Sequence, residues 1–138
     1  MSDGEMGKEG SSVAEKRYTK SHEWVLVEGE AVRTGLSAFA VGEAGSVVFI
    51  ELPSPGAEVK KGLPFGVLES SKSVYDLFAP VSGKVLEVNE AVVEAPESLE
   101  SAPEETWLTV IAPASSDELS SLMTLEEYEA FLKEREED

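Results

Sequence analysis

The chain has 138 residues, enough for one domain with one modest core, and its 28 acidic residues against 11 basic ones give a formal net charge of −17. A field of this sign repels phosphate groups, so nucleic acid and anionic membranes are poor candidates for partners, and basic protein surfaces are better ones. The sequence contains no cysteine, which excludes disulfides, thiolate chemistry and cysteine-based zinc sites. It contains one histidine, His22, which excludes metal sites built on several histidines.

The N-terminal segment has no features of a targeting sequence. Residues 1–16 lack the apolar core of a secretion signal and the arginine-rich composition of a mitochondrial transit peptide, and no apolar run approaches the ~20 residues of a membrane span. We therefore expect a disordered extension over residues 1–16, one folded domain over residues 17–135, and a monomeric cytoplasmic protein of a bacterium or archaeon. A mature protein of the mitochondrial matrix, with its transit peptide removed, is the alternative.

The first part of the folded region predicts two strands and a short helix. Residues 24–27 and 31–34 are rich in β-branched and aromatic residues and are separated by a turn that contains Gly29. A short helix is expected within residues 35–45. Its N-cap is Ser37, and its last position, Gly45, suits a left-handed C-terminal residue. The helix therefore follows the second strand directly.

The middle of the chain predicts strands only. Residues 46–52 form an apolar strand that ends at a Pro-Ser-Pro-Gly turn, and residues 58–62 form a second turn. Residues 65–78 indicate a β-hairpin, with two apolar runs on either side of the small polar tip at residues 70–73. Residues 84–89 form the next strand.

The last third predicts a loop, a strand and a helix. Residues 90–105 are acidic and contain two prolines, which favours a loop, and residues 107–111 form a closing strand. Thr124 and Glu127 form a capping box at the start of a C-terminal helix. One face of this helix is apolar and is expected to pack on the core. Its members are Leu125, Tyr128, Phe131 and Leu132.

These elements define a mainly β fold. Residues 45–48 and 83–86 are weak copies of each other on the two sides of the hairpin, which suggests two similar β halves. We therefore predict a flattened β-barrel/sandwich hybrid, with a short helix after the second strand and a C-terminal helix.

Lys72 lies at the tip of the predicted hairpin, between Ser71 and Ser73, and its nearest basic neighbours are Lys61 and Lys84. Taken alone, such a lysine is most often a solvated turn residue, because lysine is almost always exposed. The surrounding chain points elsewhere. The polypeptide is poorly equipped for catalysis on its own, so if it takes part in a reaction, a cofactor must bring the chemistry.

The sequence resembles the H protein family of the glycine cleavage system, whose members carry a lipoyl group. The resemblance covers nearly everything after residue 16, in order and at about the right spacing. The matching segments are 17–25, 47–53, 65–72, 79–90, 107–108 and 127–128.

The resemblance implies that Lys72 is amide-linked to lipoate by a lipoate ligase or lipoyl transferase. It also implies that residues 17–135 form a lipoyl-carrier domain, with the flattened β-barrel/sandwich hybrid of the lipoyl/biotinyl type. Its partners would be glycine decarboxylase, an aminomethyltransferase and dihydrolipoyl dehydrogenase, and the protein itself would have no catalytic or metal-binding residue. Ser21, Glu23 and Asp76 match residues that line a cleft for the loaded arm. An aminomethyl group is cationic near neutral pH, so a carboxylate there is a suitable partner.

Several positions depart from the family pattern and keep other roles open. Ser71 and Ser73 stand where the family usually has valine and alanine, and Ser46 and Ala95 also differ. An H-like lipoate-binding protein that serves another pathway, such as sulfur oxidation with a heterodisulfide-reductase-like complex, is therefore the alternative function. Two further classes of protein are also open. One is a biotin carrier, whose hairpin tip resembles Met-Lys-Met, and the other is an acidic adaptor that is never modified.

Overall fold

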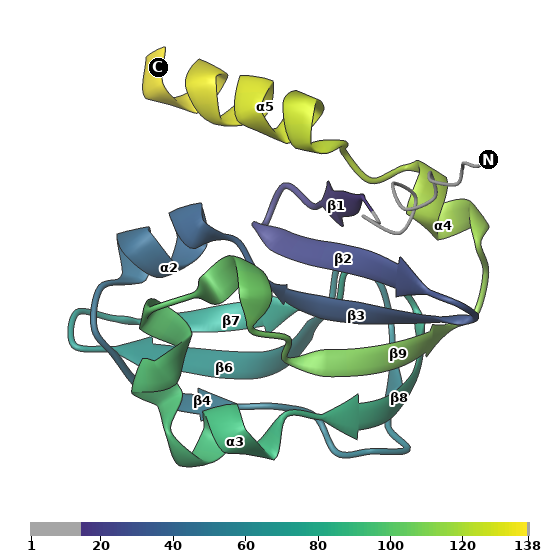
Figure 1. Ribbon diagram of the computed structural model, residues 1–138, viewed down its shortest axis with the longest axis horizontal. Helices are drawn as coiled ribbons and strands as arrows, with labels where there is room; N and C mark the ends of the chain where they lie inside the picture. Colours follow the sequence, from purple (N-terminus) through teal and green to yellow (C-terminus); the bar gives the residue numbers. More distant parts are fainter. Residues whose placement is uncertain (1–14, 138) are drawn as a thin grey trace, which may run out of the picture.

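The computed structural model describes residues 15–137 and contains two antiparallel sheets (Figure 1). The six-stranded sheet has the spatial order β1 (Lys16–Tyr18), β2 (Glu23–Glu28), β3 (Ala31–Leu36), β9 (Thr109–Pro113), β8 (Gly83–Val88) and β5 (Glu58–Val59). The three-stranded sheet has the order β4 (Val47–Glu51), β6 (Pro64–Ser70) and β7 (Val74–Phe78), so β7 is an edge strand. The predicted mainly β class is confirmed. Residues 1–14 of the predicted extension lie outside the described residues, and Lys16 begins β1.

The core lies between the two sheets. Leu36 of β3, Ile50 of β4 and Leu68 of β6 are nearly inaccessible to solvent and belong to one apolar cluster. A second cluster, around Val25 and Ile111, fills the other half of the sandwich. Each such side chain contributes on the order of 1.5–3 kcal/mol on full burial, so the alternating inward residues of these strands fix which faces meet.

Helix α2 (Ala38–Ala44) begins and ends as the sequence predicts. The Ser37 hydroxyl oxygen accepts the Ala40 N–H at 3.1 Å, which confirms the N-cap. Gly45 has a positive φ of 87°, but its ψ of −144° is outside the left-handed helical region. The backbone at this position therefore favours glycine, but the predicted left-handed helical cap is wrong.

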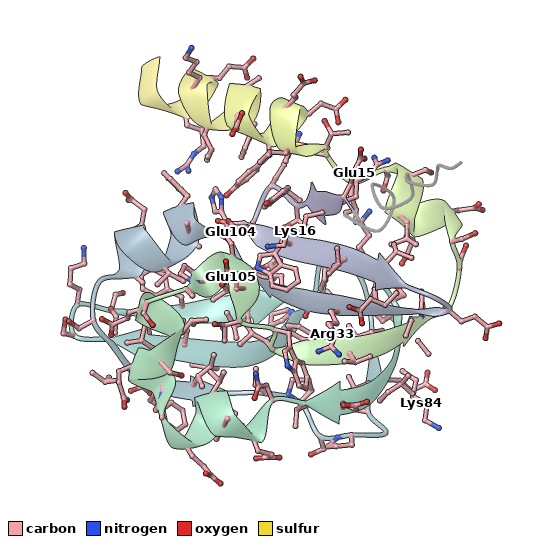
Figure 2. All side chains as sticks on the ribbon, viewed as in Figure 1. Glu15, Lys16, Arg33, Lys84, Glu104 and Glu105 are labelled. Carbon is pink, nitrogen blue, oxygen red and sulfur yellow. The ribbon has the colours of Figure 1, made fainter. Side chains whose placement is uncertain are left out.

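The carboxylate of Glu104 holds the start of α2 against the six-stranded sheet. It accepts the Ala38 N–H at 2.8 Å and the Tyr18 hydroxyl at 2.9 Å, and it pairs with the Lys16 ammonium at 3.2 Å. Figure 2 shows Glu104 and Lys16 facing each other above β2. A residue between β8 and β9 thereby fixes the position of α2.

The prediction of a loop over residues 90–105 is wrong. This segment forms helix α3 (Glu90–Glu94) and two 3₁₀ helices, η1 (Pro96–Glu100) and η2 (Pro103–Glu105). Helices α3 and η1 form because Val92 and Leu99 are buried in the core, whereas the glutamate side chains of these two helices are exposed. Proline at the first position of each 3₁₀ helix starts the turn rather than breaking it.

Two short strands lie where the sequence predicts none. β1 has three residues and β5 has two, too few for an alternating pattern to be visible in the sequence. β1 is paired along β2 and also forms a bridge between Tyr18 and Met123. β5 lies within the predicted turn at residues 58–62 and pairs with β8.

The C-terminal part forms the short helix α4 (Asp117–Ser120) and the long helix α5 (Leu125–Glu137). The capping box is confirmed, because the Thr124 N–H donates to the Glu127 carboxylate at 2.9 Å and the Glu127 N–H donates to the Thr124 hydroxyl at 3.1 Å. Tyr128 is buried and stacks on Tyr18 with ring centroids 4.5 Å apart. Leu125 is 50% exposed, so its predicted place on the buried face is wrong.

None of the helices between residues 15 and 137 is both long enough and apolar enough to span a membrane.

Candidate functional site

The hairpin tip is ordered by the side chain of Ser70. Its hydroxyl oxygen accepts the N–H groups of Lys72 and Ser73, each at 3.1 Å, and the Ser70 N–H donates to the Ser73 carbonyl at 2.8 Å. A serine side chain that bonds to the backbone of the following residues stabilises a tight turn. The tip therefore presents Lys72 in a defined direction.

Lys72 lies where the sequence places it, at the exposed tip of the β6–β7 hairpin. The neighbouring Ser71 N–H donates to the Ser46 carbonyl at 2.9 Å, which ties the tip to the segment after α2. A Cβ at Gly45 would lie 3.5 Å from the Lys72 Cε, so the aliphatic part of the lysine passes over this glycine. Within residues 15–137 the ammonium has no hydrogen-bond or ion-pair partner, and the side chain is exposed to solvent.

A cleft of about 530 Å³ begins beside the hairpin and follows β7. It brings together the three predicted cleft residues, Ser21, Glu23 and Asp76. Other side chains along it come from α2, β7 and α5, and sequence reasoning did not identify them as site residues. They include Phe39, Glu43, Val74, Tyr75 and Arg135.

Glu23 is the buried acid of the cleft, with 3% of its surface exposed. One carboxylate oxygen accepts the hydroxyls of Thr19 and Ser21, each at 2.6 Å, and the other accepts the Phe78 N–H at 3.2 Å. Burial raises the pKa of Glu23, and the three donors oppose that rise. Within the described part of the chain no cation pairs with this carboxylate.

His22 connects the cleft to the C-terminal helix. Its Nδ1 lies 2.7 Å from the Tyr128 hydroxyl, which is 2.7 Å from the Ser37 hydroxyl, and its Nε2 lies 3.3 Å from Nη1 of Arg135. Burial, followed by the charge of Arg135, lowers the pKa of His22. Because a guanidinium only donates, Nε2 accepts and Nδ1 carries the proton of the neutral ring. The position of His22 between Ser21 and Glu23 is a signal in the sequence, whereas nothing in the sequence marks Arg135.

The charge of the cleft favours a cationic ligand. Glu23, Glu43 and Asp76 line it, against one guanidinium, that of Arg135. Two opposite charges 4 Å apart attract by about 4 kcal/mol at the effective dielectric constant of ~20 typical near a protein surface. Across the described residues no group of three or more acidic or histidine side chains is placed to hold a metal ion.

A β-sandwich of this kind with one isolated lysine at a hairpin tip defines the lipoyl/biotinyl type of carrier domain. A crystal structure of a glycine cleavage system H protein from Mycobacterium marinum has the same fold. Its TM-score is 0.80 at 35% identity, and the match covers 87% of this chain and 98% of that one.

The sequence comparisons identify the family within this class. The profile of the glycine cleavage H-protein family matches residues 16–135. A glycine cleavage system H protein of Geobacillus kaustophilus is 50% identical over 121 residues, covering 87% of this chain and 95% of that protein. The corresponding protein of Bacillus subtilis is 47% identical over 119 residues, covering 86% and 94%. The chain therefore belongs to the glycine cleavage H-protein family, and not to the biotin carriers.

Proposed function

We propose that the protein is the lipoyl carrier of a glycine cleavage system and that Lys72 carries the lipoyl group. One observation carries this proposal. The Lys72 side chain is exposed, and an acidic cleft begins two residues further along the chain, at Val74. The names of the relatives favour glycine cleavage over the sulfur-oxidation alternative. When attached, lipoate would supply a disulfide that can be reduced to two thiols, one of which can carry an aminomethyl group.

The residues around Lys72 fit an acylated arm. The neighbours Ser71 and Ser73 are small, and the side chain is exposed, so a modifying enzyme has access from the solvent side. The cleft follows β7 from Val74 to Phe78, about 13 Å at the strand rise of ~3.3 Å per residue. This length is comparable to an extended lysine with a medium-chain acyl group, so the far end of the arm can reach the cleft floor.

We assign the cleft residues by their chemistry. Glu23 offers a carboxylate already held in place by Thr19 and Ser21, so it can receive a cationic cargo without reordering. Asp76 is exposed on β7 and adds a second negative charge nearer to Lys72. Phe39 and Tyr75 limit the access of water along the walls.

In this role the protein is a non-catalytic carrier over residues 17–135. Its partners would be glycine decarboxylase, the aminomethyltransferase, dihydrolipoyl dehydrogenase and the lipoate ligase or lipoyl transferase that modifies Lys72. A tethered arm meets each of them at a raised local concentration, which is the physical advantage of the carrier.

The test is Lys72→Arg, which keeps the charge but cannot form the amide, with Lys84→Arg as the matched control on β8, at the far side from α2 in Figure 2. After exposure to active ligase and lipoate, intact mass should show one lipoyl adduct on the wild type and on Lys84→Arg, and none on Lys72→Arg. The wild type and Lys84→Arg should then support the exchange of carbon dioxide into glycine by the decarboxylase, and Lys72→Arg should not. Turnover by Lys72→Arg would refute the proposal.

A further inference from the structure

Arg135 brings a positive charge into a cleft that is proposed to receive a cation. Its side chain reaches the cleft from the last turns of α5, whereas the carboxylates of Glu23, Glu43 and Asp76 come from β2, α2 and β7. The proposed function uses the acids and gives the guanidinium no role. Because like charges repel, the guanidinium weakens the attraction of the cleft for a cationic ligand.

Two contacts hold this guanidinium against the wall of the cleft. Its Cζ lies 5.4 Å from the centre of the Phe39 ring, within the range of a cation–π interaction, and its Nη1 donates to Nε2 of His22 at 3.3 Å. The His22 and Phe39 rings are themselves in contact, with centroids 4.9 Å apart. An aromatic face that is suited to an ammonium group is therefore already occupied by a cation of the chain itself.

The charge of the cleft lining depends on the same residue. Three carboxylates and one guanidinium give a formal charge of −2, against −3 without the guanidinium. A carrier has to hold its cargo between enzymes and still give it up to the next one. A cation that belongs to the cleft lowers the affinity for the cargo without removing the acids that bind it.

We propose that Arg135 is an internal competitor of the cationic cargo, which occupies the face of Phe39, offsets one cleft carboxylate and thereby weakens the hold of the cleft on the loaded arm. This inference rests on the proposed function, which supplies the cationic cargo. Arg135 is a specificity-determining residue, because its charge opposes a cationic arm and has little effect on an uncharged one. The cargo is directed away from Phe39 and toward Glu23 and Asp76.

A purely structural role of Arg135 predicts the opposite effect. If the guanidinium only held α5 against His22 and Phe39, its removal would open the wall of the cleft and weaken the binding of a cation. If it competes with the cargo, its removal strengthens that binding. The direction of the change therefore separates the two roles.

The first measurement uses the unlipoylated full-length chain with methylammonium as the probe, at constant ionic strength. Binding is followed by NMR at the Phe78 amide, which donates to Glu23. Arg135→Gln should bind methylammonium about fivefold more tightly than the wild type, the size expected for one exposed charge pair, and Arg135→Lys should bind like the wild type. Lys133→Gln is the matched control. It removes the same charge from an exposed position of α5 outside the cleft lining and should leave the affinity unchanged.

Two further readouts test the position of the guanidinium and its effect on the real cargo. Burial and then the charge of Arg135 lower the pKa of His22, so the NMR midpoint of His22 should rise in Arg135→Gln and not in Lys133→Gln. In the loaded protein without partner enzymes, water slowly converts the aminomethyl thioether into free thiol, formaldehyde and ammonium. Release of ammonium should slow in Arg135→Gln, and it should accelerate in Glu43→Gln, which removes a carboxylate of the cleft.

Several results would overturn the inference. Weaker methylammonium binding by Arg135→Gln would assign Arg135 a structural role, and an equal gain in Lys133→Gln would show that only net charge matters. An unchanged His22 midpoint in Arg135→Gln would show that the guanidinium does not lie at the cleft wall. If Arg135→Gln does not fold, unchanged binding by Glu43→Gln would refute the balance of charges on its own. Because the methylammonium titration needs no lipoyl group, a failure of Lys72 modification would refute the proposed function separately.

Discussion

The Ser70 hydroxyl orders the tip that carries Lys72, and we expect Ser70→Ala to loosen that tip without unfolding the domain. The hydroxyl accepts the N–H groups of Lys72 and Ser73 at 3.1 Å each. At about 1 kcal/mol of net stabilisation per hydrogen bond, the pair is worth about 2 kcal/mol. At tenfold per ~1.4 kcal/mol, the tip should open about 30-fold more often.

Amide hydrogen exchange measured by NMR reports this opening at the two residues concerned. Ser71→Ala is the matched control, because the Ser71 side chain is exposed and forms no hydrogen bond with another described residue. Exchange at Lys72 and Ser73 should accelerate in Ser70→Ala only, and lipoylation at limiting ligase should slow in the same variant. Equal protection of both amides in the two variants would show that the Ser70 hydroxyl does not order the tip.

Three further predictions concern the core and the two cleft residues whose pKa values are shifted, Glu23 and His22. Gly35→Ala should destabilise the fold by about 1–3 kcal/mol in urea unfolding, because the new Cβ would overlap the buried ring of Trp24, whereas Gly42→Ala, with open space at its Cβ, should gain about 0.5–1 kcal/mol. A loss of equal size in both would contradict the overlap. Burial raises the pKa of Glu23 above its ordinary value of 4.5, so its contribution to stability is full below that pH and is lost as pH rises through the raised pKa. The free energy of unfolding of the wild type minus that of Glu23→Gln should therefore fall from pH 4 toward neutrality, and a constant difference would count against this. Burial lowers the pKa of His22, so its NMR titration should have a midpoint below 6.5, and its contribution to stability should be present above that pH and lost as pH falls. A midpoint at or above 6.5 would refute this.

The hairpin and its lysine can be predicted from the sequence because their signals are local. The apolar runs on either side of residues 70–73 fix the strands, and the small polar residues between them fix the turn. The capping box at Thr124 is local in the same way, since all of its hydrogen bonds lie within four residues. Elements of this kind need no knowledge of the tertiary fold.

The errors arise where distant parts of the chain decide the structure. Residues 90–105 are acidic and contain prolines, which favours a loop, but burial of Val92 and Leu99 among strands far away in the sequence makes them helical. The cleft is similar. Ser21, Glu23 and Asp76 were identified through a family resemblance, whereas Arg135 reaches the cleft through contacts with His22, 113 residues earlier, which no local pattern encodes.

The hydrogen bond between the Phe78 N–H and the Glu23 carboxylate also bears on how the protein avoids self-association through a sheet edge. β7 is an edge strand, and such an edge invites an added strand from another molecule. At this edge the Phe78 N–H already donates to the Glu23 carboxylate. A carboxylate has no N–H group, so it cannot continue the hydrogen-bond ladder toward another strand. An incoming strand would have to displace a buried acid to register with β7 at this point. The residue that we assign to the cargo therefore also protects the sheet from intermolecular β-pairing, and removing its side-chain acceptor, as in Glu23→Ala, should make the protein more prone to aggregate.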